Sequence, residues 1–333
     1  MKRLVILVVV LAALGGIAWG VGAMATRTTA ERWIAARAAY GWVAHADAIS
    51  VGGFPLAFRT RFTDLELADP ATGLAWTAPR FDLEHRVLRL DQLSAIWPDA
   101  QLIGSPEERL TVTSTAMTAA LDVQPTARFA LDAMQARMAD VFVRSTAGWQ
   151  LALQTARLDV TRVAGTVARY DLAFEAAALV PPDALRVRLD PGSLLPEAID
   201  RATARATIAF DAPWDIAAIE VARPQITAIA IDEINATWGD MLFRAAGDLA
   251  VTPGGIPEGD LAIRAENWRA MVDLAENSGL LPARLRPTAE AMLGVLAGMS
   301  GSAENIDATL SFSNGRVFVG PLPIGPAPSL RLR

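Results

Sequence analysis

From about residue 46 onward, apolar and polar residues alternate with a period of two, which is typical of half-buried β-strands. Phe58 and Phe62 alternate with Arg59 and Arg61. The apolar phase shifts by one residue near Thr63, which predicts a β-bulge. Strands are predicted at 58–62, 65–67, 81–83, 110–112, 117–123, 141–143, 149–153, 170–174, 185–189, 208–210, 226–231, 241–243 and 261–263.

Two helical patterns come late in the chain, near 266–278 and 282–298, where apolar residues recur at helical spacing. Long helices between successive strands, which a parallel sheet would need, are missing from the pattern. Asn314-Gly315 between two alternating segments is a strong hairpin signal, because a type I′ turn needs positive φ at both central positions. The expected fold class is therefore mainly β (α+β): a large curved antiparallel β-sheet with a late α-hairpin, preceded by one N-terminal transmembrane helix.

The N-terminal segment is basic and then apolar. After Met1-Lys2-Arg3, the segment 4–25 carries no charged residue, and about 20 apolar residues span a bilayer as a helix. A basic cytoplasmic flank orients such a helix with its N-terminus inside. Ala23-Met24-Ala25 would alternatively serve as a signal-peptidase site. Both alternatives export the rest of the chain.

Three regions follow from this pattern. We expect a membrane anchor or signal at 1–26 and a connecting helix at 27–45, which begins at the capping-box spacing Thr28 to Glu31. We expect a periplasmic β-rich domain at 46–333. The predicted location is therefore the inner membrane of a Gram-negative envelope, with a single pass and the body in the periplasm.

The composition removes several classes of function. A net charge of −6 argues against a nucleic-acid partner, because such proteins carry concentrated basic surface. The chain has no cysteine and two histidines, His45 and His85, so few residues are available for catalysis or metal binding. Both histidines fit a surface or partly buried position. We expect no enzyme activity, no metal and no cofactor.

The apolar side of the first strands is the candidate functional feature. A sheet with one apolar face must be covered by a second layer, and incomplete cover leaves a groove that suits acyl chains. A closed core made by the same residues is the alternative. The groove would be lined by Phe58, Phe62, Leu65, Leu67, Phe81 and Leu83. The expected partner is lipid; a module that scaffolds an envelope complex through another envelope protein is the second hypothesis.

Two sequence stretches carry a family resemblance. The first is 52–59, where Gly52-Gly53-Phe54-Pro55 predicts a tight turn with Phe54 packed inside, followed by 65–67 and 74–79. The second is the proline-rich tail 320–328. Together they resemble an alphaproteobacterial family of unknown function, numbered twenty-one twenty-five, which implies no activity. The architecture also resembles AsmA-like envelope proteins, which implies lipid handling between membranes.

Overall fold

Antiparallel strands make up most of the computed structural model, which describes residues 2–279, 281–299, 302–320 and 322–332. The predicted mainly-β fold with an antiparallel sheet and few helices is confirmed. The chain divides into two compact units. Unit 1 is Met1–Pro125 with Ala136–Gly148, and unit 2 is Thr126–Gln135 with Trp149–Arg333.

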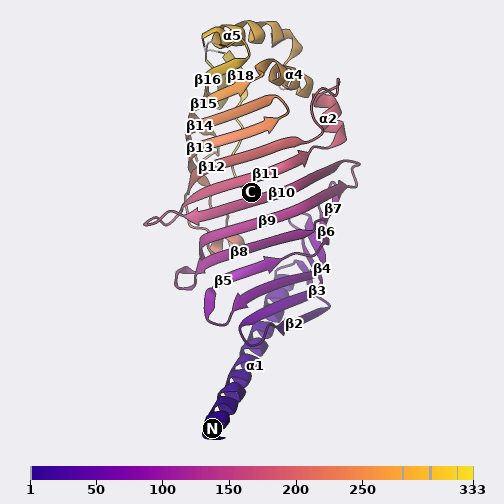
Figure 1. Cartoon of the computed structure of the whole chain (residues 1–333), viewed down its shortest axis with the longest axis vertical. Coiled ribbons are helices and arrows are strands. Elements are labelled where there is room, and N and C mark those ends of the chain that lie inside the picture. Colours follow the sequence, from indigo (N-terminus) through magenta and orange to yellow (C-terminus); the bar gives the residue numbers. More distant parts are fainter. Residues whose placement is uncertain (1, 280, 300–301, 321, 333) are drawn as a thin grey trace. The chain divides into compact units, whose positions relative to one another are not determined.

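Unit 1 combines one long helix with antiparallel strands (Figure 1). Strand β3 pairs with β1 and β2 on one side and with β4 on the other; β4 pairs with β5 and β6, β5 with β8, β6 with β7, and β7 with β9. The elements are α1 (Lys2–Ala39), β1 (Val43–His45), β2 (Ala48–Gly52), β3 (Ala57–Asp69), β4 (Leu74–Arg86), β5 (Arg89–Ile96), β6 (Ala100–Gly104), β7 (Arg109–Thr113), β8 (Ala116–Gln124), η1 (Pro125–Ala127) and β9 (Ala130–Ser145); η1 and β9 extend into residues of unit 2.

Helix α1 is continuous, which differs from the expected anchor followed by a separate connecting helix. The capping-box spacing lies inside the helix, where the Thr29 hydroxyl donates to the carbonyl of Ala25, 2.9 Å away. The helix ends at Ala39, and 43–45 forms β1 instead of helix. The side chains of 4–12, in the predicted anchor, lie outside the described residues. In the part of the chain that the structure describes, we find no helix long and apolar enough to cross a membrane.

Unit 2 is a meander, in which each strand from β10 to β18 pairs antiparallel with the next. Its elements are β10 (Gln150–Arg162), β11 (Arg169–Val180), α2 (Asp183–Leu189), β12 (Ile199–Phe210), α3 (Ile216–Glu220), β13 (Ile226–Trp238), β14 (Met241–Val251), β15 (Pro257–Glu266), α4 (Trp268–Ser278), η2 (Ala283–Leu285), α5 (Arg286–Met299), β16 (Asn305–Ser313), β17 (Arg316–Val319) and β18 (Leu322–Pro326).

The predicted strand at 185–189 is wrong, because these residues belong to helix α2. Pro182 precedes the helix and Asp183 lies in its first turn, where a carboxylate interacts favourably with the helix dipole. Leu185 and Val187 alternate with arginines, yet both are exposed. The alternation of apolar and charged residues at 185–189 therefore does not come from a strand with one buried face.

The late helices and the hairpin lie where the pattern placed them. Helices α4 and α5 contribute Trp268, Val272 and Ala297 to a buried cluster with strands β15 and β16. Asn314 and Gly315 join β16 to β17 with φ angles of 53° and 72°, the left-handed values that the turn requires.

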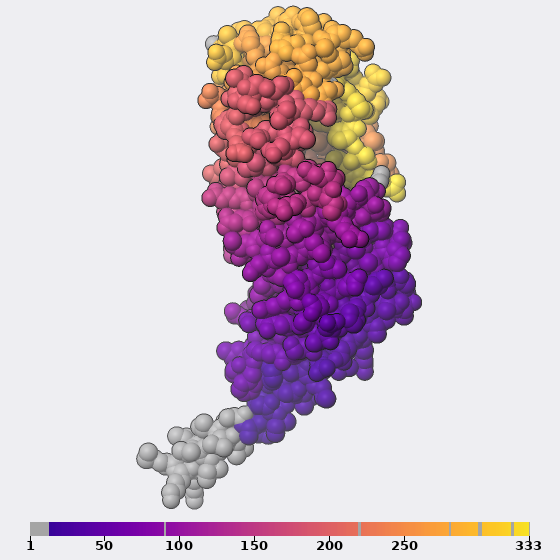
Figure 2. Space-filling model, turned by 90° about the vertical axis from the view of Figure 1, so that its right-hand side faces the viewer, coloured from indigo at the N-terminus to yellow at the C-terminus, as the bar shows by residue number. Residues whose placement is uncertain are grey.

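The C-terminal segment closes one side of unit 2. The backbone N–H of Leu330 donates to the Gly255 carbonyl at 2.7 Å. The Gln225 side chain both donates to and accepts from the backbone of Leu332, at 3.0 Å in each case. Figure 2 shows this segment in yellow, with a hollow between it and residues coloured red near position 200.

The backbone of unit 2 requires glycine at position 247. Its φ is +146°, and a Cβ there would lie 2.3 Å from the Asp260 carbonyl oxygen on the paired strand. We expect Gly247→Ala to lower the free energy of unfolding by about 2 kcal/mol or more, since a strained backbone alone costs about 1–3 kcal/mol. Urea denaturation followed by tryptophan fluorescence measures this.

Gly294→Ala is the matched control, because Gly294 lies in α5 and a Cβ there meets open space. It should leave stability unchanged or raise it by about 0.5–1 kcal/mol. Equal losses in the two variants would contradict the steric argument.

Candidate apolar binding site

An apolar cavity lies between α1 and one face of strands β3, β4 and β5, all within unit 1. Its volume is about 650 Å³, within the roughly 300–1,000 Å³ typical of small-molecule pockets. It is lined by Ala25, Thr26, Thr29, Ala30, Trp33, Thr60, Phe62, Leu65, Leu67, Trp76, Phe81, Leu83, His85 and Leu93.

Small residues on α1 leave room for the cavity. The lining positions Ala25, Thr26, Thr29, Ala30 and Trp33 recur at helical spacing and share one face of the helix. Four of the five are alanine or threonine, so the helix backbone covers the sheet while its side chains leave the space between unfilled. A stripe of leucines at these positions would close the core instead.

The sheet side of the cavity depends on the predicted phase shift. Asp64 has φ +47°, and the pairing of β3 with β4 keeps its register on either side of it. The predicted β-bulge is therefore wrong, because no residue is inserted; the left-handed backbone at Asp64 makes the shift. The shift lets Phe62 and Leu65 face α1 although they are three residues apart. Without it, an uninterrupted alternation would turn Leu65 to the opposite face.

One part of this layer is a closed core. Ile49, Phe62 and Leu65 are buried there, and Ile34 of α1 packs against them. The cavity opens beside this cluster, so the closed core and the open space share residues. Sequence reasoning treated the two as alternatives.

Five of the six predicted groove residues line the cavity: Phe62, Leu65, Leu67, Phe81 and Leu83. Phe58 is buried on the same side of the sheet, but it does not line the cavity and packs against Trp19 instead. Its ring stacks on that of Trp19 with centroids 5.6 Å apart, and it lies against Gly22.

Sequence reasoning missed the helix side of the cavity, together with Trp76, His85 and Leu93. The alanine and threonine spacing after residue 25 was the available signal. It was missed because residues 1–26 and 27–45 were interpreted as two separate segments.

His85 is a polar group on the cavity wall. Its imidazole lies 5.3 Å from the Phe58 ring, measured between ring centroids. Burial lowers the pKa of His85 below its ordinary value of 6.5, because the charged form is disfavoured where water is scarce. His45, in contrast, is exposed, and its Nε2 lies 2.9 Å from an Asp47 carboxylate oxygen.

The opposite face of β3 and β4 is charged, and one of its carboxylates is buried. The Asp82 side chain is only 1% exposed, between Arg61 and Arg80. Burial by itself would raise the pKa of Asp82, but hydrogen bonds from Arg80 and Arg61 outweigh it and hold that pKa below its ordinary value. The two guanidinium groups offset the cost of burying this charged carboxylate.

The predicted turn residues Gly52, Gly53, Phe54 and Pro55 join β2 to β3. Gly53 has φ +98°, and a Cβ there would lie 2.8 Å from the Ala57 carbonyl oxygen. The expectation that Phe54 packs inside is wrong: its side chain is 58% exposed. One edge of its ring contacts Trp19, with the ring centroids 5.4 Å apart.

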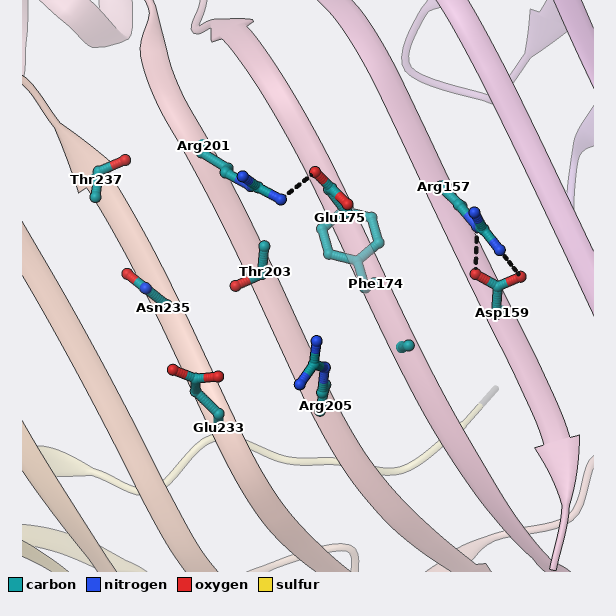
Figure 3. A pocket seen from close by; sticks show the side chains of 11 residues that line it. Arg157, Asp159, Phe174, Glu175, Arg201, Thr203, Arg205, Glu233, Asn235 and Thr237 are labelled. Atoms are coloured by element: carbon teal, nitrogen blue, oxygen red, sulfur yellow. Dashed lines mark hydrogen bonds and ion pairs between the residues drawn. The ribbon is translucent and has the colours of Figure 1, made fainter.

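Unit 2 carries a polar depression of about 360 Å³ on one face of strands β10 to β13. Figure 3 shows that its acidic and basic side chains are largely paired. Arg201 on β12 forms an ion pair with Glu175 on the neighbouring strand β11, and Arg157 forms one with Asp159 on its own strand, β10. Such cross-strand pairs stabilise a solvated sheet face. Among the described residues, no three His, Asp or Glu side chains lie close enough together to hold a metal ion.

Comparison with known proteins identifies a family and nothing further. A sequence model of the family described as "Uncharacterized protein conserved in bacteria (DUF2125)" matches residues 19–328, which confirms the resemblance carried by 52–59 and 320–328. No curated protein and no solved structure matches the chain. The resemblance to AsmA-like proteins is not confirmed.

The position of His85 gives a pH prediction. Because its pKa is lower in the folded than in the unfolded chain, the unfolded chain binds more protons just below pH 6.5, and stability falls as the pH drops through that value. We expect the urea midpoint of the wild type to fall between pH 7 and pH 5 by more than that of His85→Leu. His45→Leu is the control, and an equal pH dependence in wild type and His85→Leu would contradict the assignment.

Proposed function

The chain belongs to the uncharacterised bacterial family DUF2125, and we propose that it is a non-catalytic, membrane-anchored envelope protein that holds a fatty acyl chain of a membrane lipid. The observation that carries this proposal is the apolar cavity between α1 and strands β3 to β5. Binding there would need contact alone and no chemistry.

The lining of the cavity favours an acyl chain over a polar ligand. Ten of the fourteen lining residues are leucine, phenylalanine, tryptophan or alanine, and the other four are three threonines and one histidine. Burying apolar surface contributes about 25 cal/mol per Å², or about 0.8 kcal/mol per methylene. A flexible hydrocarbon chain gains this free energy of burial for each methylene that enters the cavity.

The position of the cavity on α1 supports a lipid as the source of that chain. The cavity begins at Ala25, where the uncharged segment 4–25 ends. Arg27 and Arg32 follow within two turns, and cations at this level interact favourably with anionic headgroups. A chain leaving the bilayer along α1 would meet the cavity first.

Contacts of α1 favour an uncleaved anchor over a signal peptide. The Trp19 indole N–H donates to the carbonyl of Ala57 at 3.0 Å, and its ring contacts Phe54 and Phe58. Cleavage after Ala25 would remove these contacts. The family match also begins at residue 19. With the basic start at Lys2-Arg3, these points support a single pass through the inner membrane and a body in the periplasm.

A cavity-filling substitution tests the ligand. We expect Thr29→Trp to weaken lipid binding, because an indole in the middle of the lining stripe excludes part of the chain. Excluding about three methylenes forfeits about 2.4 kcal/mol, or roughly a 50-fold loss of affinity. Native mass spectrometry and lipid extraction of full-length protein from bacterial membranes give the amount of lipid bound.

Ala35→Trp is the matched control, because Ala35 is exposed on the same helix and does not line the cavity. It should bind as much lipid as the wild type. A well-folded wild-type protein that is purified without any lipid would refute the proposal. Crosslinking to a protein partner would then test the scaffold hypothesis.

The anchor has a separate test. We expect the full-length protein to stay with membranes after alkaline carbonate washing, because a spanning helix is not released by high pH. Alkaline phosphatase fused after Arg333 should be active, since it folds only outside the cytoplasm. A mature N-terminus at Thr26, found by intact-mass analysis, would contradict the anchor and identify a cleaved signal peptide.

A further inference from the structure

Helix length places a loop of unit 1 at the depth of the membrane. An α-helix rises about 1.5 Å per residue, and the hydrocarbon core is about 30 Å thick, so a span needs about 20 residues. A span that starts at Leu4 therefore continues to about residue 23. Gly16 and Trp19 lie before that point, within the bilayer or at its interface.

The β2–β3 loop lies beside these two helix residues. The Phe54 ring contacts Trp19 and lies 4.0 Å from where a Cβ of Gly16 would be. A loop held at this position cannot stay in water while the helix beside it crosses the bilayer. The 58% exposure of Phe54 then has a physical reason.

Two further apolar side chains extend the same surface. Leu56 is 75% exposed and Leu88, at the β4–β5 turn, is 90% exposed. The two loops are joined directly, because the Val87 N–H donates to the Leu56 carbonyl at 3.0 Å. Phe54, Leu56 and Leu88 therefore form one exposed apolar group, which we call the basal patch.

The charges around the basal patch suit lipid headgroups. Arg86 and Arg89 flank Leu88 and face each other across the turn, and Arg89 is also paired with Asp91. Arginine side chains near an inserted apolar tip extend toward phosphate while their stems stay in apolar surroundings. Trp19 also fits this depth, because tryptophan is enriched at membrane interfaces.

We infer that the basal patch inserts into the outer leaflet of the membrane that α1 crosses, and so gives unit 1 a second attachment to the bilayer. This inference rests on the proposed anchor, since the depth argument starts from α1. The contact would hold the Ala25 end of the cavity close to the lipid that supplies its ligand.

Site-specific labelling tests the contact, and the absence of native cysteine makes it direct. Full-length Leu56→Cys and Leu88→Cys carry an environment-sensitive fluorophore and are reconstituted into vesicles of phosphatidylcholine and phosphatidylglycerol that contain spin-labelled lipid. Leu14→Cys in α1 reports on the anchor. Leu74→Cys is the matched control, because Leu74 is an exposed leucine at the opposite end of β4, about 40 Å away along the strand.

We expect lipid quenching at positions 56 and 88 to exceed that at 74 several-fold, and aqueous iodide to show the reverse order. Quenching at 14 with none at 56 and 88 would overturn the basal patch and leave the anchor intact. Quenching at 56 and 88 without quenching at 14 would refute the anchor and, with it, the inference as stated, because the patch would then contact lipid independently of α1. No quenching at any of the three positions would overturn both.

Discussion

The apolar face of β3 and β4 has to be covered, and the structure of unit 1 depends on how α1 does this. A half-buried sheet exposes one row of apolar side chains that water disfavours. Helix α1 covers that row with alanine and threonine between Ala25 and Trp33. Its Ala30 and Ile34 pack against the buried side chains of Ile49, Phe62 and Leu65. Helix α1 therefore packs tightly on the sheet around Ile49 and leaves a space beside that cluster. This space is the cavity.

The same helix connects this cavity to the uncharged segment 4–25, so that two proposed roles share one element. Trp19 ties α1 to the Phe54 loop, and Thr29 lies on the cavity wall ten residues later. Because both contacts lie on one rigid helix, the distance between the bilayer and the cavity has little freedom. An acyl chain would then pass a short distance along apolar surface instead of crossing water.

Much of the fold could be predicted from alternation alone, and the failures have identifiable causes. The antiparallel strands, the late helices and the Asn314-Gly315 hairpin follow from local patterns. The alternation at 185–189 predicted a strand, but after two prolines the chain forms α2. The length of β12, at Ile199–Phe210, was underestimated because alanine and threonine give little periodic contrast. The burial of Asp82 could not be predicted, because its pairing with Arg61 depends on the register between β3 and β4.

The sequence by itself determined which side of each strand is apolar, where the chain turns, and that 4–25 carries no charge, since these depend on neighbours within a few residues. It also identified five residues of the cavity wall, from Phe62 to Leu83. Only the tertiary structure decided that α1 covers this wall, that His85 faces the cavity and that Phe54 lies beside Trp19. Those contacts join segments far apart along the chain, and local periodicity carries no information about which distant surfaces meet.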